Sequence, residues 1–436
     1  MPVSAPASRA PQGDKNASLF RTASGRHYFV PFLLVTGLFF MWGFAHSLLD
    51  VLNKHFQNTL HLNKAQSAFV QSSMYFGYFV MALPAGVILR RLGYKGAVIF
   101  GLAAFAVGAF WFAPAVNINA YWAFLAGIFV IAMGLTCLET AANPYVTLLG
   151  PPETAASRIN LAQTFNGLAW IVGPYVGGEV LFNPDKMAHV GNDGLKHIYV
   201  TLGIVVTVIA VAFLFAKLPE AAKEEEAAGD LPVAAANEGA SLFSRKHFVG
   251  AIVAQFAYVA AQTGIFAFFI NYTVDASKAW CEPGTHWSDG QAAKLFSGAF
   301  ALFAGGRFLG SFVMRKLKAE SVLRLYAGAN VVLMAVVLAD IRYVSLGAVC
   351  VSFFFMSIMF PTIFSLGVHN LGEKAKSASS FIIMAIVGGA IVTPAMGRIA
   401  DIWSMRAGFV VPLVGFLVIF AYAFLWRRLA GESVRN

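Results

Sequence analysis

Long apolar segments separated by short polar ones recur along the whole chain, and this alternation predicts an all-α membrane protein. Each segment holds about twenty residues, enough for a helix to cross a hydrocarbon core of roughly 30 Å. The stretches "GAVIFGLAAFAVGAFWFAPAV" and "GFVVPLVGFLVIFAYAFLW" contain no charged residue at all. We predict twelve transmembrane helices, at 29–54, 65–89, 95–116, 120–147, 155–181, 195–217, 246–275, 289–314, 321–339, 344–370, 375–400 and 407–428.

The predicted helices fall into two similar sets of six. "SSMYFGYFVMALPAGVILRRLG" resembles "SGAFALFAGGRFLGSFVMRKLK", and "ANPYVTLLG" resembles "MFPTIFSLG". A duplicated six-helix unit explains this similarity, and transporters built in this way bind substrate near the membrane midplane between the halves. The expected organisation is a cytoplasmic N-terminal tail (1–28), an N-terminal half (29–217), a cytoplasmic linker (218–244), a C-terminal half (245–428) and a cytoplasmic C-terminal tail (429–436).

Composition supports the membrane class and excludes several others. Of the 436 residues, 58% are hydrophobic and only 12% are charged, whereas soluble domains carry about 25% charged residues. The net charge of +10 does not indicate nucleic acid, because the Lys and Arg residues gather in the loops that are cytoplasmic when both termini are inside. The polar residues 1–28 include no apolar core typical of a cleaved signal peptide.

No sequence pattern typical of an enzyme, a metal site or a cofactor site is present. Cys137, Cys281 and Cys350 lack the spacing of metal ligands, and no two of them are obvious disulfide partners. Phosphate-binding loops and nucleophile motifs are also missing from the sequence. We therefore expect neither enzymatic activity nor a bound cofactor.

Several motifs together resemble the L-fucose permease type of sugar transporter in the major facilitator superfamily. They include "LFFMWGFAHSLLDVLNKHFQ", "CLETAANPYVTLLGP", "NLAQTFN", "AQFAYVAAQTG" and "PTIFSLGVHNLG", which occur in the family's order over nearly the whole chain. The resemblance implies proton-coupled symport of a monosaccharide. It leaves the sugar open among L-fucose, other hexoses and N-acetylhexosamines.

Two carboxylates inside the apolar segments are the candidate proton-coupling groups. An ionisable residue in the bilayer core is costly and normally faces a cavity or a partner. Glu139 could be a neutral side chain bonded to a neighbouring helix, but the resemblance implies that Glu139 and Asp50 couple proton movement to sugar transport. Asp50 could alternatively pair with Lys54. His46, one turn before Asp50, is expected to contact it as a proton relay, to bind sugar or to have a structural role.

Amide and hydroxyl side chains at helical spacing are the candidate sugar ligands. Amides can both donate to and accept from sugar hydroxyls, although buried amides also commonly bridge helices. The candidates for substrate binding are Gln71, Tyr75, Asn143, Gln163, Asn166, Gln255, Tyr258 and Gln262. Arg307 is expected to be a charge at the inner end of its helix that reaches the membrane interface.

These observations predict a monomeric proton–monosaccharide symporter in the inner (plasma) membrane of a bacterium. Its partners would be sugar, proton and membrane lipid, with no nucleic acid. A proton-antiporting sugar exporter and a non-transporting sugar sensor are the alternatives. The second half has neutral residues where the first has Asp50 and Glu139, so we expect coupling in the first half and a more apolar sugar wall in the second.

Overall fold

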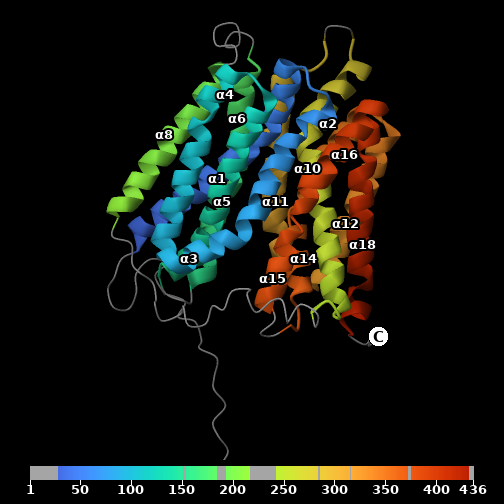
Figure 1. Cartoon of the computed structure of the whole chain (residues 1–436). Helices are drawn as coiled ribbons and strands as arrows, with labels where there is room; N and C mark the ends of the chain where they lie inside the picture. Colours follow the sequence, from blue (N-terminus) through green and yellow to red (C-terminus); the bar gives the residue numbers. More distant parts are fainter. Residues whose placement is uncertain are drawn as a thin grey trace, which may run out of the picture.

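The computed structural model describes residues 28–150, 154–183, 193–216, 242–282, 285–314, 316–371 and 375–431, and throughout these ranges the secondary structure is helical (Figure 1). The first half contains α1 (Phe29–Leu60), α2 (Lys64–Ser67), α3 (Phe69–Phe110), α4 (Phe112–Ile118), α5 (Tyr121–Leu148), α6 (Ala155–Leu181) and α8 (Asp193–Phe215). The second half contains α10 (Lys246–Trp280), α11 (Asp289–Val313), α12 (Ala319–Ala339), α13 (Arg342–Met356), α14 (Met359–Gly367), α15 (Ala375–Met384), α16 (Val387–Ile402), α17 (Met405–Gly408) and α18 (Val410–Ala430).

The described part of each of the twelve predicted spans lies mainly on one or two of these helices. Within the described ranges, nine helices are long and apolar enough to cross a membrane, and the longest, Lys64–Ile118, covers two predicted spans. That helix is interrupted at Gly93, whose φ of 66° belongs to the left-handed region that glycine adopts without steric cost. The spans at α6 and α11 are also helical, but they contain more polar residues. The all-α fold class is confirmed, while most of the predicted linker (218–241) and of the N-terminal tail (1–27) lies outside the described residues.

Two predicted spans are broken helices. The tenth is divided into α13 and α14 at Ser357–Ile358, and the eleventh into α15 and α16 at Ala385–Ile386. Pro361 follows the first break by a few residues, and a proline removes one backbone N–H from the helical pattern. The tenth predicted span is still one segment long and apolar enough to cross a membrane, at Arg342–Gly367, with this break inside it.

Each half has its own apolar core. One core is built mainly from α1, α3, α5 and α8, and the other mainly from α10, α12, α14 and α18. In Figure 1, α3, α5 and α8 lie on one side, and α12, α16 and α18 on the other. Separate cores allow each half to move largely as a unit.

The described halves bind each other at the far end of the bundle, which is the end opposite the C-terminus (Figure 1). Three ion pairs, which we call the far-end ion pairs, join them here. They are Lys54–Asp289 at 3.7 Å, Lys64–Asp275 at 3.4 Å and Lys294–Glu179 at 2.6 Å.

Backbone contacts add to this closure at the far end. The Asp401 carboxylate accepts the backbone N–H groups of Lys64 and Ala65, each at 2.9 Å. Gly178 lies so close to α11 that an added Cβ would be 2.8 Å from the Cβ of Ala293. The far end is therefore closed in this structure.

Candidate functional site

Glu139 lies on α5 beside an aromatic pair from α1 and α3. Its Oε1 accepts a hydrogen bond of 2.9 Å from the Tyr78 hydroxyl. The centroid of the His46 ring lies 5.3 Å from that of the Tyr78 ring. No ion pair forms at Glu139 among the described residues, so the carboxyl can change its charge without losing a fixed cation.

Trp170 links this group to the second half. Its ring stacks on the His46 ring, with the two centroids 5.8 Å apart. The Trp170 centroid also lies 5.0 Å from the centroid of Phe300 and 6.0 Å from that of Phe266. Phe266 and Phe300 belong to a larger cluster of rings on α10, α11 and α13. The second half thus contributes an apolar aromatic wall, and Trp170 is where this wall meets the Glu139 group; that the wall contacts sugar stays a prediction.

Asp50 is buried on α1 and is held by an amide rather than by a cation. Gln71 Nε2 of α3 donates to Asp50 Oδ1 at 3.1 Å. Lys54 pairs with Asp289 instead, so the alternative of an Asp50–Lys54 pair is not observed. His46 makes no hydrogen bond to Asp50, and the expected contact between the two is therefore missing from this conformation.

The Tyr75 ring on α3 connects the two carboxylates to the second half. Its hydroxyl is within electrostatic range of both Asp50 and Glu139. The same hydroxyl accepts a hydrogen bond of 3.2 Å from Thr263 Oγ1 on α10. Tyr75 is therefore at the centre of the bundle, where both halves contribute side chains.

The three amides of α5 and α6 form two different kinds of contact. Gln163 Nε2 donates to Asn143 Oδ1 at 3.4 Å, and both side chains are half-buried. Asn166 is buried and donates to the Phe39 carbonyl of α1 at 2.9 Å. Asn166 thus bridges two helices, as the alternative interpretation of the buried amides anticipates, whereas Asn143 and Gln163 keep exposed surface.

Tyr258 and Arg307 hold the broken helix in the second half. The Tyr258 hydroxyl donates to the Met356 carbonyl at 3.0 Å, and Arg307 Nε donates to the Ser357 carbonyl at 3.3 Å. The Arg307 guanidinium also lies over the Phe303 ring, 5.1 Å from its centroid. Arg307 therefore contacts the helix break, while the expectation that it reaches the membrane interface stays a prediction.

The last two candidates on α10 differ in exposure. Gln255 is fully buried, and neither amide atom has a hydrogen-bond partner among the described residues. Gln262 is half-buried and makes no hydrogen bond to the described part of the chain. Gln262 has exposed surface and an amide without a hydrogen-bond partner in the described ranges, which are the properties needed to bind an incoming hydroxyl.

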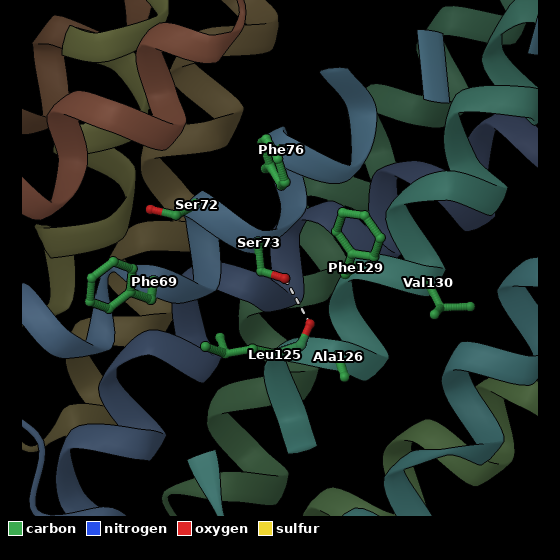
Figure 2. Close-up of a pocket in the computed structure, with 8 residues that line it drawn as sticks. All are labelled: Phe69, Ser72, Ser73, Phe76, Leu125, Ala126, Phe129 and Val130. Atoms are coloured by element: carbon green, nitrogen blue, oxygen red, sulfur yellow. Dashed lines mark hydrogen bonds between the residues drawn. The ribbon is translucent and has the colours of Figure 1, made fainter. Parts of the chain in front are cut away.

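A separate groove between α3 and α5 contains none of these candidates (Figure 2). Its walls are mostly apolar, with Phe69 and Phe76 about half exposed. Ser73 Oγ bonds to the Leu125 carbonyl at 2.7 Å and presents little free polarity (Figure 2). Apolar surface of this kind suits contact with lipid chains, and we do not assign it to the site.

Sequence reasoning overlooked Trp170 and three amides near Asp50. Trp170 is four residues after Asn166 and therefore on the same helix face, which was the available signal. Asn53, Gln57 and Asn271 are polar residues within apolar helices, but their mutual contacts depend on how α1 and α10 meet. Sequence alone gives no information on that meeting.

Comparison with known proteins gives a family and several relatives of nearly full length. The model of the Major Facilitator Superfamily matches residues 32–394. The chain is 37% identical to the L-fucose-proton symporter of Escherichia coli (strain K12), over 91% of this chain and 93% of that protein. It is 35% identical to a glucose/galactose transporter of Brucella abortus biovar 1 (strain 9-941), over 93% and 96% of the two chains. A crystal structure of the transporter FucP in the outward conformation matches with a TM-score of 0.64 and 34% identity. The match covers 92% of this chain and 99% of the FucP chain.

Proposed function

Because the chain belongs to the Major Facilitator Superfamily, we propose that it carries a monosaccharide across the membrane together with a proton. One observation carries the proposal. Asp50 and Glu139 lie inside the helical bundle, bound by neutral donors and outside any ion pair of the described residues. The names of the relatives, an L-fucose-proton symporter and a glucose/galactose transporter, support the same function.

In this proposal Glu139 and Asp50 are the proton-coupling groups. A carboxyl that takes up a proton becomes neutral, which lowers the cost of enclosing it in a low-dielectric bundle. Release of the proton restores a charge that favours hydration. Each carboxyl can therefore favour different conformations in its two protonation states.

The sugar would bind between Glu139 and the aromatic wall. Apolar walls with a few placed polar groups are typical of small-molecule sites. Trp170 offers a ring face for the C–H surface of a pyranose, while Gln163, Asn143 and Gln262 offer amides for its hydroxyls. Tyr75 can contact sugar from the α3 side. Gln255, Tyr258, Gln71 and Asn166 would support this site, since their side chains are buried.

We propose that the near end, where α1 begins and α18 ends, faces the cytoplasm of a bacterial cell. Basic residues at this end, Arg90, Arg91, Lys95, Arg427 and Arg428, agree with the positive-inside rule. The far end is then the outer end, and its closure is that of an inward-facing carrier. The modest superposition on a relative in the outward conformation supports a different placement of the two halves here.

Uptake by proteoliposomes with a panel of labelled sugars tests this function. L-Fucose, D-glucose, D-galactose and N-acetylglucosamine should be compared at an imposed proton gradient. Accumulation with alkalinisation of the outer medium is expected for symport. Acidification would indicate the antiporting exporter, and binding without any accumulation would indicate a sensor.

A further inference from the structure

A chain of buried amides runs from Asp50 to the contact between the halves. Gln71 Nε2 donates to Asp50, and Asn53 Nδ2 donates to Gln71 Oε1 at 3.4 Å. Gln57 Nε2 donates to Asn53 Oδ1 at 2.9 Å. Asn271 Nδ2 of α10 then donates to Gln57 Oε1 at 2.5 Å. We call these four residues the amide chain.

The shortest hydrogen bond of each link in the amide chain has the same direction. Each amide donates its N–H towards Asp50 and accepts at its oxygen from the next amide away from it. The Asp50 carboxylate is the terminal acceptor, and an ionised carboxylate is the stronger acceptor. Hydrogen bonds arranged head to tail polarise one another. The observed orientation is therefore the one that an ionised Asp50 favours.

The last link crosses from one half to the other. Gln57 lies on α1 and Asn271 on α10, so the bond from Asn271 Nδ2 to Gln57 Oε1 joins the two halves. Ser67, the last residue of the short α2, accepts a hydrogen bond at its Oγ from Gln57 Nε2 at 2.8 Å. The charge of Asp50 can thus affect a contact that must break when the outer end opens.

We propose that the amide chain couples the protonation of Asp50 to the outer closure, a proposal that rests on proton-coupled transport as the function. Ionised Asp50 stabilises the closed outer end through Gln57 and Asn271. Protonation removes the charge at the end of the chain and makes Asp50 a donor as well as an acceptor, which weakens the oriented bonds. A protonated carrier without sugar then stays open to the outside.

This direction of coupling prevents a proton leak. A carrier that closed after binding only a proton would release it inside and dissipate the gradient. With the amide chain weakened by protonation, outer closure requires the additional contacts made by sugar. In this scheme the ionised carrier closes without that help. Asn53, Gln57 and Asn271 are positioning residues in this scheme because they act through Asp50.

Other titratable groups surround Asp50 and must be separated from it in a test. On α1 itself, His46 lies one turn before Asp50, and Lys54 and His55 lie about one turn after it. The neighbouring helices α3 and α5 contribute Tyr75 and Glu139. On the side of α6, Gly177 packs against α1 and brings no titratable side chain. Asp50→Asn removes the titration of Asp50 alone and mimics its neutral form.

The test measures opening of the outer end by the distance between two spin labels in a cysteine-free background. Labels at the exposed positions Asn117 and Trp403 report on the two halves at this end. Asp50→Asn should raise the ratio of open to closed outer ends by about tenfold, the scale of one charge-assisted hydrogen bond. In the background of Asn271→Leu, the same substitution should change the ratio by less than about twofold.

Two further variants make the result decisive. Gln57→Leu removes the bond between the amide chain and Asn271 and should therefore have the same effect as Asn271→Leu. With two such variants, the test remains possible if one of them misfolds. Lys294→Gln removes a far-end ion pair outside the chain, so Asp50→Asn should keep its tenfold effect there. The proposal would be overturned if Asp50→Asn kept its full effect in both Asn271→Leu and Gln57→Leu. It would also be overturned if Asp50→Asn had no effect in the protein without other substitutions.

A pH titration and an uptake assay complete the test. In the protein without substitutions, the fraction of molecules with an open outer end should increase as the pH falls. In Asn271→Leu this fraction should depend much less on pH. Sugar uptake measured on the same samples separates the two proposals. If the protein without substitutions takes up no sugar, the proposed function is refuted. If uptake is normal but opening of the outer end does not depend on the charge of Asp50, only the role of the amide chain is refuted.

Discussion

Glu139→Gln tests the coupling role of Glu139 with the least disturbance of the fold. The glutamine Oε1 can still accept the Tyr78 hydroxyl that now bonds to the carboxylate. A hydrogen bond to a charged group contributes about 1.5–3 kcal/mol and a neutral one about 0.5–1.5 kcal/mol. The exchange therefore costs about 1–1.5 kcal/mol, and the variant should fold and insert normally.

The expected loss lies in accumulation, and its size follows from the driving force. One charge moving through about 100 mV supplies about 2.3 kcal/mol. At about 1.4 kcal/mol per decade this corresponds to roughly 50-fold accumulation for a symporter with one proton per sugar. Glu139→Gln cannot release a proton from this position, so accumulation should fall to about onefold. Exchange of labelled for unlabelled sugar should continue, because exchange needs no net proton movement.

Proteoliposomes with an imposed potential allow both quantities to be measured on one preparation. Thr140→Val is the matched control, since the Thr140 hydroxyl bonds only within its own helix, to the Thr136 carbonyl. It should keep the full accumulation. Accumulation of about 50-fold in Glu139→Gln would refute the coupling role, and loss of exchange together with accumulation would mean that Glu139 binds sugar instead.

Three further predictions follow from the same geometry. Gln262→Ala should weaken sugar binding by up to about two decades with unchanged thermal stability, while Asn166→Ala should also destabilise the protein by about 0.5–1.5 kcal/mol because it removes a buried hydrogen bond between α6 and α1; equal stability of the two variants in detergent would contradict this. His46→Gln should shift the pH profile of uptake between about pH 5 and pH 9 if His46 exchanges protons with the Glu139 group, whereas a uniform decrease at every pH would leave it a packing or sugar-binding residue. Lys294→Glu should open the outer end by repulsion from Glu179, and adding Glu179→Lys should close it again; a double variant as open as the single one would argue against this ion pair.

Sequence predicted those parts of the site that one helix determines by itself. Asp50 and Glu139 are detectable as charges within apolar segments, and their placement in the bundle follows from the cost of exposing a charge to lipid. Gln71 and Tyr75 share one face of α3 by spacing alone. Gln71 does donate a hydrogen bond to Asp50, whereas the Tyr75 hydroxyl bonds to Thr263 in the other half.

Contacts between helices could not be predicted in the same way. Asn166 and Gln262 are both amides within predicted spans, yet Asn166 bonds to α1 and Gln262 makes no hydrogen bond to any residue that the structure describes. Pro144 and Pro361 occupy equivalent positions in the two halves, but α5 is continuous and the tenth span is broken. At the break in the second half, Tyr258 and Arg307 donate to the Met356 and Ser357 carbonyls, and these contacts between helices cannot be read from the sequence.

The far-end ion pairs make the resting orientation of the carrier depend on the ionic strength of its surroundings. Their side chains range from 15% exposed at Lys54 to 52% exposed at Lys294, so dissolved ions reach some pairs far more than others. Attraction between exposed charges is screened over about 8 Å at 0.15 M salt and over about 30 Å at 0.01 M. In dilute medium the empty protein should rest more firmly closed to the outside, whereas concentrated salt should free it to open. A cell that meets changing salinity would thereby alter how many of its carriers await sugar at the outer surface, without any change in gene expression.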